Sequence, residues 1–241
     1  MQTGSAFSRG LAVFPGSIFS FIFPPSCLAC TAPLPPGTRD LCSVCLGKLS
    51  HAQEGDAIFR RTFQALSAGG FIDGLVAPYY FEKEGPLQQV IHLLKYGGMT
   101  VAGNFLGAAI GSELRTRFHD FRSVVIVPVP LHRVKLRERG FNQSEIIARG
   151  IARQTGARLA ASIVSRVIHT RSQTTLDSIQ RARNVEGVFK IRKRNIGVLQ
   201  GETVLLVDDV ITTGATIRSC AMALRPSGVQ SIIACAAALA E

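Results

Sequence analysis

Three short, unbroken apolar runs dominate the second half of the sequence, and segments with helical spacing separate them. The runs are VVIVPV at 124–129, TVLLV at 203–207 and SIIACAA at 231–237. A strand that is buried on both faces of a sheet has this composition. Helices are expected from about residue 142, where Asn142 and Glu145 are spaced as a capping pair, and over 215–225. The order strand, helix, strand therefore predicts an α/β fold with a parallel sheet flanked by helices.

The first half of the sequence extends this pattern. A strand is expected at 75–81, and helices at 86–96 and 101–117, whereas residues 46–70 are interpreted as a connector. The chain has 241 residues, of which 46% are hydrophobic and 18% charged. These values exclude disordered, collagen-like and coiled-coil proteins, and they suit one domain with a small appendage.

Four cysteines near the N-terminus form two close pairs, in the spacing C-x2-C-x11-C-x2-C. They are Cys27, Cys30, Cys42 and Cys45. Two such pairs can bring four thiolates onto one ion, so the pattern predicts a compact structural zinc site that has no open position for catalysis. Two disulfides or a redox dithiol are the alternatives. Cys220 and Cys235 stand in apolar surroundings and are interpreted as buried core residues, and His51 as a surface residue.

The segment before the cysteines is apolar but interrupted. Residues 11–23 contain Pro15 and Gly16, and Pro24 and Pro25 stand where a secretory signal would have small residues. We expect an amphipathic segment over 1–25 that packs on the protein; an exported precursor and peripheral membrane contact are the alternatives. Because these features argue against export, we expect a cytoplasmic protein. No apolar run reaches the ~20 residues that span a membrane, so we do not expect an integral membrane protein. The expected division is 1–25, a cysteine module at 26–60, and an α/β domain at 71–241.

The net charge of +11 is concentrated in one third of the chain. Residues 121–200 carry +12, whereas 1–120 carry +1 and 201–241 carry −2. Such a concentrated field attracts phosphates, on a small ligand or on a nucleic acid.

The candidate chemistry follows the strand at 203–207. Asp208 and Asp209 come directly after it, and a loop of small and hydroxyl residues then opens onto the helix at 215–225. Ligands of open α/β sheets bind beyond the carboxyl ends of strands. Backbone N–H groups and Thr hydroxyls at a helix N-terminus form a cradle for a phosphate. The two carboxylates would then face sugar hydroxyls or a magnesium ion.

This stretch, VLLVDDVITTGAT, resembles the phosphoribosyl pyrophosphate (PRPP) signature of type I phosphoribosyltransferases. The resemblance implies that Asp208 and Asp209 hold the ribose hydroxyls of PRPP. It also implies that the following loop binds the 5′-phosphate; the loop residues are Thr212, Thr213, Gly214, Ala215 and Thr216. Mg²⁺ is expected to accompany PRPP.

Further motifs resemble the ComF family of competence-associated phosphoribosyltransferases. They are the cysteine module, Lys95-Tyr96-Gly97, and the stretch PVPLHRVKLRERGFNQ at 128–143. The last is interpreted as a basic loop whose Arg133, Arg137 and Arg139 suit a pyrophosphate, although it could simply be solvated. Lys95 is included among the PRPP-binding residues.

The basic stretch 166–194 is similar in its first part to the mobile loop of PRPP amidotransferases. Within it we expect Arg171 to stabilise the departing pyrophosphate. The run 192–194 is interpreted as a surface turn or a nucleic-acid contact. The chain begins Met1-Gln2-Thr3 and lacks the N-terminal cysteine of those enzymes, so glutamine-derived ammonia is not expected as the acceptor.

Two functional hypotheses follow. The first is a phosphoribosyltransferase that uses PRPP, Mg²⁺ and an unidentified nitrogen acceptor, with Asp208, Asp209 and Arg171 as catalytic residues. The second is a non-catalytic PRPP-binding protein that contacts single-stranded DNA, and with it proteins of competence and recombination. The few aromatic residues in 121–200 count against base stacking there.

Overall fold

The computed structural model describes residues 25–167, 187–192 and 197–241. The expected amphipathic segment at 1–25 falls almost entirely outside the described residues, and Arg171 and most of the basic run 192–194 also lie outside them. Within the described ranges, no helix is long and apolar enough to cross a membrane.

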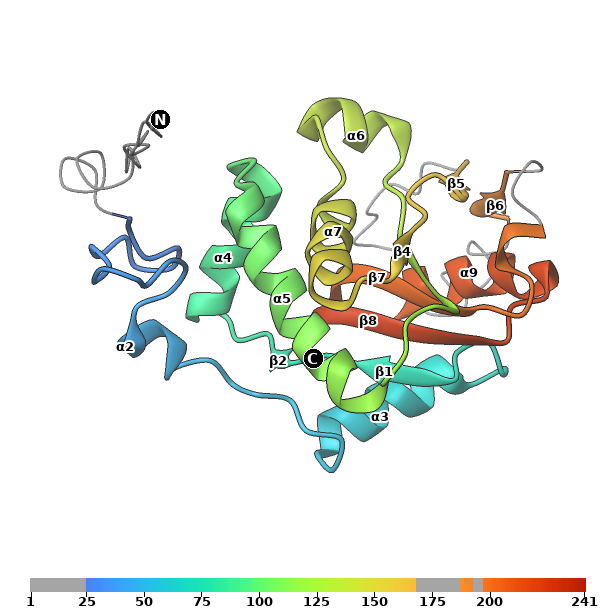
Figure 1. Cartoon of the computed structure of the whole chain (residues 1–241), viewed down its shortest axis with the longest axis horizontal. Coiled ribbons are helices and arrows are strands. Elements are labelled where there is room, and N and C mark those ends of the chain that lie inside the picture. Colours follow the sequence, from blue (N-terminus) through green and yellow to red (C-terminus); the bar gives the residue numbers. More distant parts are fainter. Residues whose placement is uncertain (1–24, 168–186, 193–196) are drawn as a thin grey trace, which may run out of the picture.

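The centre of the fold is a parallel sheet of six strands (Figure 1). Its order is β1-β8-β7-β3-β4, and β2 lies along β8 beyond β1. The strands are β1 (Gly74–Val76), β2 (Tyr79–Tyr80), β3 (Val124–Pro128), β4 (Arg158–Leu159), β7 (Thr203–Ile211) and β8 (Ser231–Leu239). Every pairing in it is parallel, so the predicted α/β fold is confirmed.

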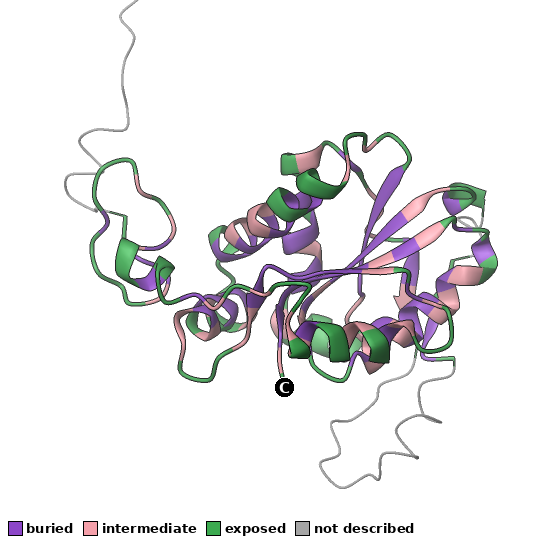
Figure 2. Ribbon diagram, turned by 90° about the horizontal axis from the view of Figure 1, so that it is seen from below, coloured by how far each residue is buried: buried purple, intermediate pink, exposed green. Residues whose placement is uncertain are grey.

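Helices cover both faces of this sheet, as the view from below shows (Figure 2). The helices α4 (Pro86–Tyr96), α5 (Thr100–Arg117) and α7 (Gln143–Thr155) pack on one face, and α3 (Ala57–Ser67) and α9 (Ala215–Leu224) pack on the other. Alternate residues of β7 contribute to the two cores: Leu205 and Val207 to the first, Val204 and Leu206 to the second. This two-sided burial explains why the strands are continuously apolar.

The remaining elements are short. They are α2 (Ser43–Leu46), α6 (Arg133–Arg139), the 3-10 turn η2 (Arg225–Ser227), and the antiparallel pair β5 (Val164–Arg166) and β6 (Phe189–Ile191).

Four boundaries differ from the sequence prediction. The expected strand at 75–81 is two strands, separated at Ala77 and Pro78. The expected connector at 46–70 contains α3, whose Phe59 and Leu66 are buried. β7 continues to Ile211, and so includes the acidic pair. The expected basic loop contains the helix α6, which the apolar pattern could not show because α6 buries no residue.

Glycines bring α5 and α7 into close contact. Gly103, Gly107 and Gly111 recur every four residues and so lie on one face of α5. A Cβ added at Gly107 would lie 2.7 Å from the Cα of Gly150 on α7, and one at Gly111 would lie 2.7 Å from Gln154 Cβ. The backbones can therefore approach only because these positions lack side chains, and this contact fixes where α7 lies.

We predict that Gly107→Ala destabilises the protein by about 1–3 kcal/mol, because the new methyl group overlaps the backbone of α7. The measurement is urea unfolding. Gly55→Ala is the matched control, since a Cβ at the exposed Gly55 meets nothing within 4 Å. Equal unfolding free energies for the two variants would contradict the role of the glycine contact.

Candidate active site

The acidic pair lies where β7 extends past its neighbour. β7 pairs with β3 only as far as Pro128 and Val207, but continues beside β8 to Ile211 and Leu239. Asp208 and Asp209 therefore follow the last residue paired with β3, at the carboxyl edge of the sheet. This is the edge at which ligands bind in open α/β folds.

Each carboxylate has its own partner from a different helix. Asp208 Oδ1 accepts hydrogen bonds from Ser144 Oγ at 3.0 Å and from the backbone N–H of Asp209 at 2.9 Å. Asp209 is only 6% exposed, and its Oδ2 lies 2.5 Å from Lys95 Nζ. The site thus joins the end of α4 and the start of α7 to β7. Lys95, which the sequence analysis includes among the PRPP-binding residues, thus lies at the acidic pair, whereas Ser144 was not predicted.

Burial and the charge of Asp209 disturb the ionisation of Asp208. Burial is the main cause that raises the pKa of Asp208 to about 7, and the charge of Asp209 raises it further, against the hydrogen bonds from Asp209 N–H and Ser144. The site therefore favours a proton, or a bound cation, beside Asp208 near neutral pH.

The loop after β7 forms a small hollow at the N-terminus of α9. The hollow is open to solvent and is lined by Asp208 and by residues 210–217. Thr213 Oγ1 accepts a hydrogen bond from Ala215 N–H at 3.4 Å. The structure thus brings Asp208 and the predicted residues Thr212, Thr213, Gly214, Ala215 and Thr216 together on one concave surface.

Gly214 meets two requirements in this loop. Its φ is +69°, a left-handed conformation that L side chains rarely adopt, and it caps α9. A Cβ there would also overlap the side chain of Leu66, which is fully buried on α3. The unpredicted helix α3 therefore supports the loop from below.

The start of α7 is fixed by Asn142. Its Oδ1 accepts from Ser144 N–H at 3.2 Å, and its Nδ2 donates to the carbonyl oxygen of Val129 at 3.0 Å. The predicted capping role of Asn142 is confirmed. The Glu145 side chain does not complete the pair but bonds Arg149 at 2.6 Å, one turn along the helix.

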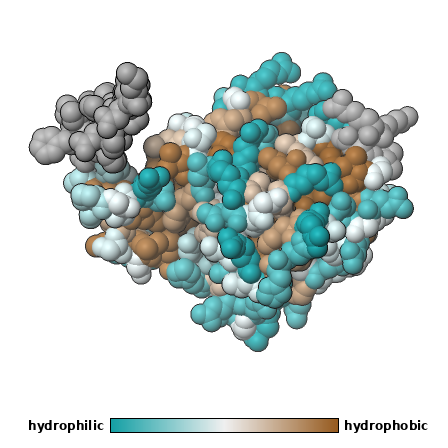
Figure 3. Space-filling model, in the orientation of Figure 1, coloured by the Kyte–Doolittle hydropathy of each residue, from teal (hydrophilic) through white to brown (hydrophobic). Residues whose placement is uncertain are grey.

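Of the three arginines predicted to bind pyrophosphate, Arg139 is connected to the site by contacts. Arg139 Nη1 donates to Gln143 Oε1 at 2.6 Å, and its guanidinium lies 5.6 Å from the ring centroid of Tyr96. Arg133 and Arg137 are exposed on α6. Figure 3 shows hydrophilic surface over the upper edge of the molecule, where α6 lies.

Arg166 is a further cation near the pair that the sequence did not single out. It ends β5, and its guanidinium lies 5.6 Å from the ring centroid of Phe189 on β6. Burial lowers its pKa, while the charge of Asp208 raises it. A lone arginine in a short strand carries no signal that could have identified it.

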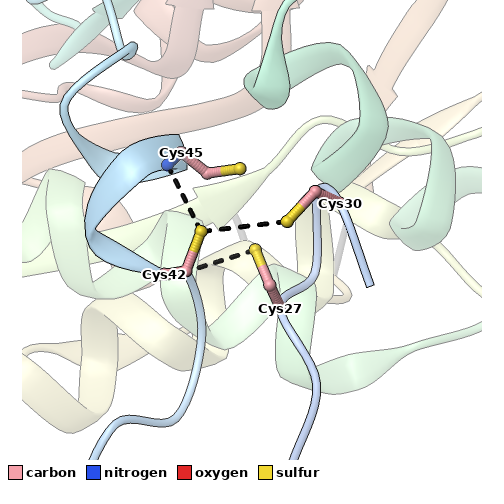
Figure 4. A group of neighbouring side chains, drawn as sticks. All are labelled: Cys27, Cys30, Cys42 and Cys45. Atoms are coloured by element: carbon pink, nitrogen blue, oxygen red, sulfur yellow. Dashed lines mark hydrogen bonds between the residues drawn. The ribbon is translucent and has the colours of Figure 1, made fainter. Parts of the chain in front are cut away.

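The four N-terminal cysteines converge in a second site (Figure 4). Their sulfur atoms all lie within 4.8 Å of one another, and Cys30 Sγ is 3.8 Å from Cys42 Sγ. A disulfide requires about 2.05 Å, whereas two thiolates at about 2.3 Å from a tetrahedral ion lie about 3.8 Å apart. All six cysteines of the chain are unpaired, and Cys220 and Cys235 are buried as predicted.

The thiols of this cluster ionise unequally. Burial raises the pKa of Cys27, but the backbone N–H groups of Cys30, Cys42 and Ala29 outweigh it and lower the pKa to about 6. Cys42 N–H approaches Cys27 Sγ at 3.4 Å. Burial and the neighbouring sulfur atoms raise the pKa of Cys45 to about 12. The cluster could bind a zinc ion, which would displace the proton that burial favours on Cys45.

Comparison with known proteins agrees with this geometry. Residues 138–240 match the family model described as phosphoribosyl transferase domain. Competence protein F of Haemophilus influenzae is 35% identical over 111 residues, which cover 44% of this chain and 46% of that protein. DNA utilization protein YhgH of Escherichia coli is 28% identical over 229 residues, or 87% of this chain and 94% of that protein. The chain is therefore similar to proteins of the ComF family, and it contains a phosphoribosyl transferase domain.

A third ComF relative is similar over a shorter segment. Competence protein ComFC of Bacillus subtilis is 29% identical over 142 residues, which cover 59% of this chain and 55% of that protein. The predicted resemblance to ComF proteins is therefore confirmed. Lys95 and the cysteine cluster lie outside the matched domain 138–240. The connection of Lys95 to that domain rests on its contact with Asp209.

We predict that Asp208→Asn removes a pH-dependent loss of stability. The pKa of Asp208 in the folded protein lies above its ordinary value of 3.8, so the native state binds this proton more tightly. Its contribution is fully present below about pH 4 and is lost as the pH rises towards 7. Asparagine keeps the Oδ1 acceptor but cannot ionise. The unfolding free energy of the variant relative to wild type should therefore increase between pH 4.5 and 7.5 in urea titrations.

Asp120→Asn is the control, because the exposed Asp120 has a lowered pKa beside Arg122 and stays ionised over this range. A difference between Asp208→Asn and wild type that stays constant with pH would contradict the raised pKa.

Proposed function

We propose that this protein binds PRPP at the end of β7 and transfers its phosphoribosyl group to a nitrogen acceptor. One observation carries the proposal: an acidic pair, held by Ser144 and Lys95, lies beside a threonine-lined hollow at a helix N-terminus. A sugar phosphate requires these two kinds of group side by side, oxygen acceptors for its hydroxyls and N–H donors for its phosphate.

Each part of the site has its own role in binding PRPP and in the transfer. The backbone N–H groups and hydroxyls of residues 212–216 bind the 5′-phosphate. Asp208 and Asp209 orient the ribose hydroxyls, and so hold the anomeric carbon in place for attack. Departure of pyrophosphate builds negative charge, which Arg139 is positioned to offset from the side of α6. We retain Arg133, Arg137 and Arg171 as candidates for the same role.

Magnesium suits this donor set. Carboxylate oxygen atoms are ligands that Mg²⁺ prefers, and Asp208 lines the open hollow. When bound with PRPP, the ion would neutralise charge on the pyrophosphate and favour its departure. Lys95 keeps Asp209 paired with a positive charge before any ligand arrives.

The alternative is a PRPP-binding protein without turnover that contacts single-stranded DNA. The basic helix α6 favours it, because Arg133, Lys135 and Arg137 are exposed on a helix that buries no residue. The names of two relatives, a competence protein and a DNA utilization protein, point to the same area of biology, and hence to partners in competence and recombination.

For the cysteine cluster we propose one structural zinc ion held by Cys27, Cys30, Cys42 and Cys45. Four sulfur ligands leave no open position, so the ion would stabilise the module at 26–60 rather than react. Leu28, Leu34 and Leu41 of this module pack in the same core as α4 and α5. Loss of the ion should therefore weaken the adjoining domain at 71–241. Thiols kept reduced for zinc are consistent with the proposed cytoplasmic location.

For the active site, we predict that PRPP with Mg²⁺ binds the wild-type protein, and that Asp208→Asn and Asp209→Asn each abolish turnover. The measurements are calorimetric titration of PRPP and release of pyrophosphate with a panel of bases and amines. Asp120 is exposed and forms an ion pair with Arg122, so Asp120→Asn is the matched control and should behave as wild type.

The same assays separate the two functions. Binding of PRPP without pyrophosphate release, together with DNA affinity that falls steeply with salt, would favour the binding protein. If folded protein with Mg²⁺ gives no heat with millimolar PRPP, both proposals are wrong.

For the cysteine cluster, we predict about one zinc ion per chain by elemental analysis. Cys27→Ala should release it and lower the unfolding free energy, because metal binding is coupled to folding of the module. Cys220→Ala, which removes a thiol from the buried face of α9, should retain the zinc. Full zinc occupancy in Cys27→Ala would contradict the assignment.

A further inference from the structure

We infer that Ser144 is a positioning residue of the sugar site, because its hydroxyl holds the carboxylate of Asp208 in one orientation towards the hydroxyls of a bound sugar. The inference rests on the proposed function and gives a role in it to a residue outside the phosphate loop. Ser144 Oγ donates to Asp208 Oδ1 at 3.0 Å. Ser144 is only 1% exposed, whereas Asp208 lines the hollow, so Ser144 acts on a ligand through Asp208.

The hydroxyl of Ser144 is not needed to form its own helix. Ser144 is the second residue of α7, where backbone N–H groups have no acceptor within the helix. Asn142 caps this turn, since its Oδ1 accepts the Ser144 N–H at 3.2 Å. The side chain of Ser144 donates instead to a residue 64 positions later in the chain. A buried hydroxyl needs a hydrogen-bond partner, and here the fold supplies an acidic residue of the candidate site.

Two other hydroxyl groups of the chain show the more ordinary arrangement. Ser227 Oγ donates to the carbonyl oxygen of Leu224 at 2.6 Å, and Thr155 Oγ1 donates to that of Ile151 at 2.9 Å. Each bond joins residues three or four positions apart, a local pattern that is common for Ser and Thr in and beside helices. Ser144 differs from both in having a distant carboxylate as its acceptor.

A closed ring of hydrogen bonds holds Ser144 opposite Asp208. Val129 N–H donates to the carbonyl oxygen of Val207 at 2.8 Å, just past the last pair of β3 and β7. Asn142 Nδ2 donates to the carbonyl oxygen of Val129 at 3.0 Å, and Asn142 Oδ1 accepts from Ser144 N–H. The bond from Ser144 to Asp208, which follows Val207 in the chain, closes the ring. The ring therefore sets the separation between the hydroxyl and the carboxylate.

The hydrogen bonds that Asp208 accepts from the described residues are made to one oxygen atom. Ser144 Oγ and the backbone N–H of Asp209 both donate to Oδ1, one from α7 and the other from β7. Two donors on different elements fix the plane of the carboxylate, which still lines the hollow. Because a hydrogen bond weakens steeply when its geometry is poor, an acceptor held in this way favours a hydroxyl at one defined position.

This ring includes Asp208 but none of the phosphate-loop residues 212–216. Removal of the Ser144 hydroxyl should therefore weaken the recognition of sugar hydroxyls and leave the recognition of the phosphate unchanged. A loss of packing in α7 would instead weaken every ligand of the site to the same extent. The two effects are distinguished by comparing sugar phosphates that differ only in their hydroxyl groups.

The test titrates the full chain with Mg²⁺ calorimetrically, using ribose 5-phosphate, 2-deoxyribose 5-phosphate and 3-deoxyribose 5-phosphate. Wild type should bind ribose 5-phosphate more tightly than at least one of the deoxy compounds. Ser144→Ala should weaken ribose 5-phosphate roughly three- to tenfold, as expected for one hydrogen bond, and reduce the preference over that deoxy compound by the same factor. Ser227→Ala, which removes a buried hydroxyl that bonds within its own turn, is the matched control and should keep wild-type affinities.

A double-mutant cycle tests whether Ser144 acts through Asp208. In the Asp208→Ala protein, Ser144→Ala should change the affinity for ribose 5-phosphate less than about twofold, because the acceptor of its hydrogen bond is already absent. A full additional loss in that background would overturn the inference. An equal loss for all three ligands in Ser144→Ala would also overturn it, since Ser144 would then only support α7.

A second variant tests the same ring if Ser144→Ala does not fold. Asn142→Ser keeps a side chain that can cap α7 but is shorter than the one that reaches the carbonyl oxygen of Val129. It should reduce the preference for ribose 5-phosphate in the same direction. An unchanged preference in the folded variants would overturn the inference.

Failure of the proposed function is recognised separately. If wild type binds neither PRPP nor ribose 5-phosphate, the proposed function is wrong and the role of Ser144 is wrong with it. If wild type binds both ligands and Ser144→Ala binds them equally well, only the role of Ser144 is wrong.

Discussion

Two adjacent carboxylates at the end of a buried strand need an opposite charge and hydrogen-bond donors, and the surrounding helices supply both. Asp209 is almost fully buried, and an ionised carboxylate in such a place must be paired. Lys95 supplies the opposite charge from α4, and Ser144 supplies a hydrogen bond to Asp208 from α7. The helices α4 and α7, which are separated in the sequence, therefore both contact the end of β7. The Lys95 contact also places the end of α4, which carries the Lys95-Tyr96-Gly97 motif, beside the acidic pair.

The contact between α5 and α7 determines whether Ser144 can reach Asp208. Because glycines on α5 face Gly150, the two helix backbones lie close together, and the start of α7 is carried towards β7. Asn142 then fixes the first turn of α7 through its bond to the carbonyl oxygen of Val129 at the end of β3. The position of Ser144 thus depends on small residues far from the ligand, and the geometry of the site is a property of the helix packing.

The parts that sequence reasoning predicted are those encoded locally. Continuous apolar runs identified β3, β7 and β8, because burial on both faces leaves no other pattern. The spacing of the cysteines predicted their convergence, and the order of acids, threonines and glycine predicted the hollow beside α9. Each of these signals lies within about twenty residues of sequence.

The parts that were missed depend on contacts between distant segments. Nothing in the sequence distinguishes Ser144 or Arg166 as a site residue. Only the fold gives Ser144 its hydrogen bond to Asp208 and brings Arg166 close enough to interact with that charge. The helix α6 lacks an apolar face, so periodicity could not reveal it. The helix α3 was hidden because only Phe59 and Leu66 of its residues are fully buried. The specific packing of Leu66 against Gly214 arises from tertiary structure alone.

That last contact changes where the α/β domain should be considered to begin. A boundary at residue 71 follows the composition of the chain, but it would separate α3 from the loop that α3 supports. A fragment starting there would keep every strand of the sheet and all five residues of the phosphate loop, yet it would leave the underside of Gly214 facing water. The segment between the cysteine module and the sheet is therefore part of the α/β domain, because its helix α3 packs directly under the phosphate-binding loop.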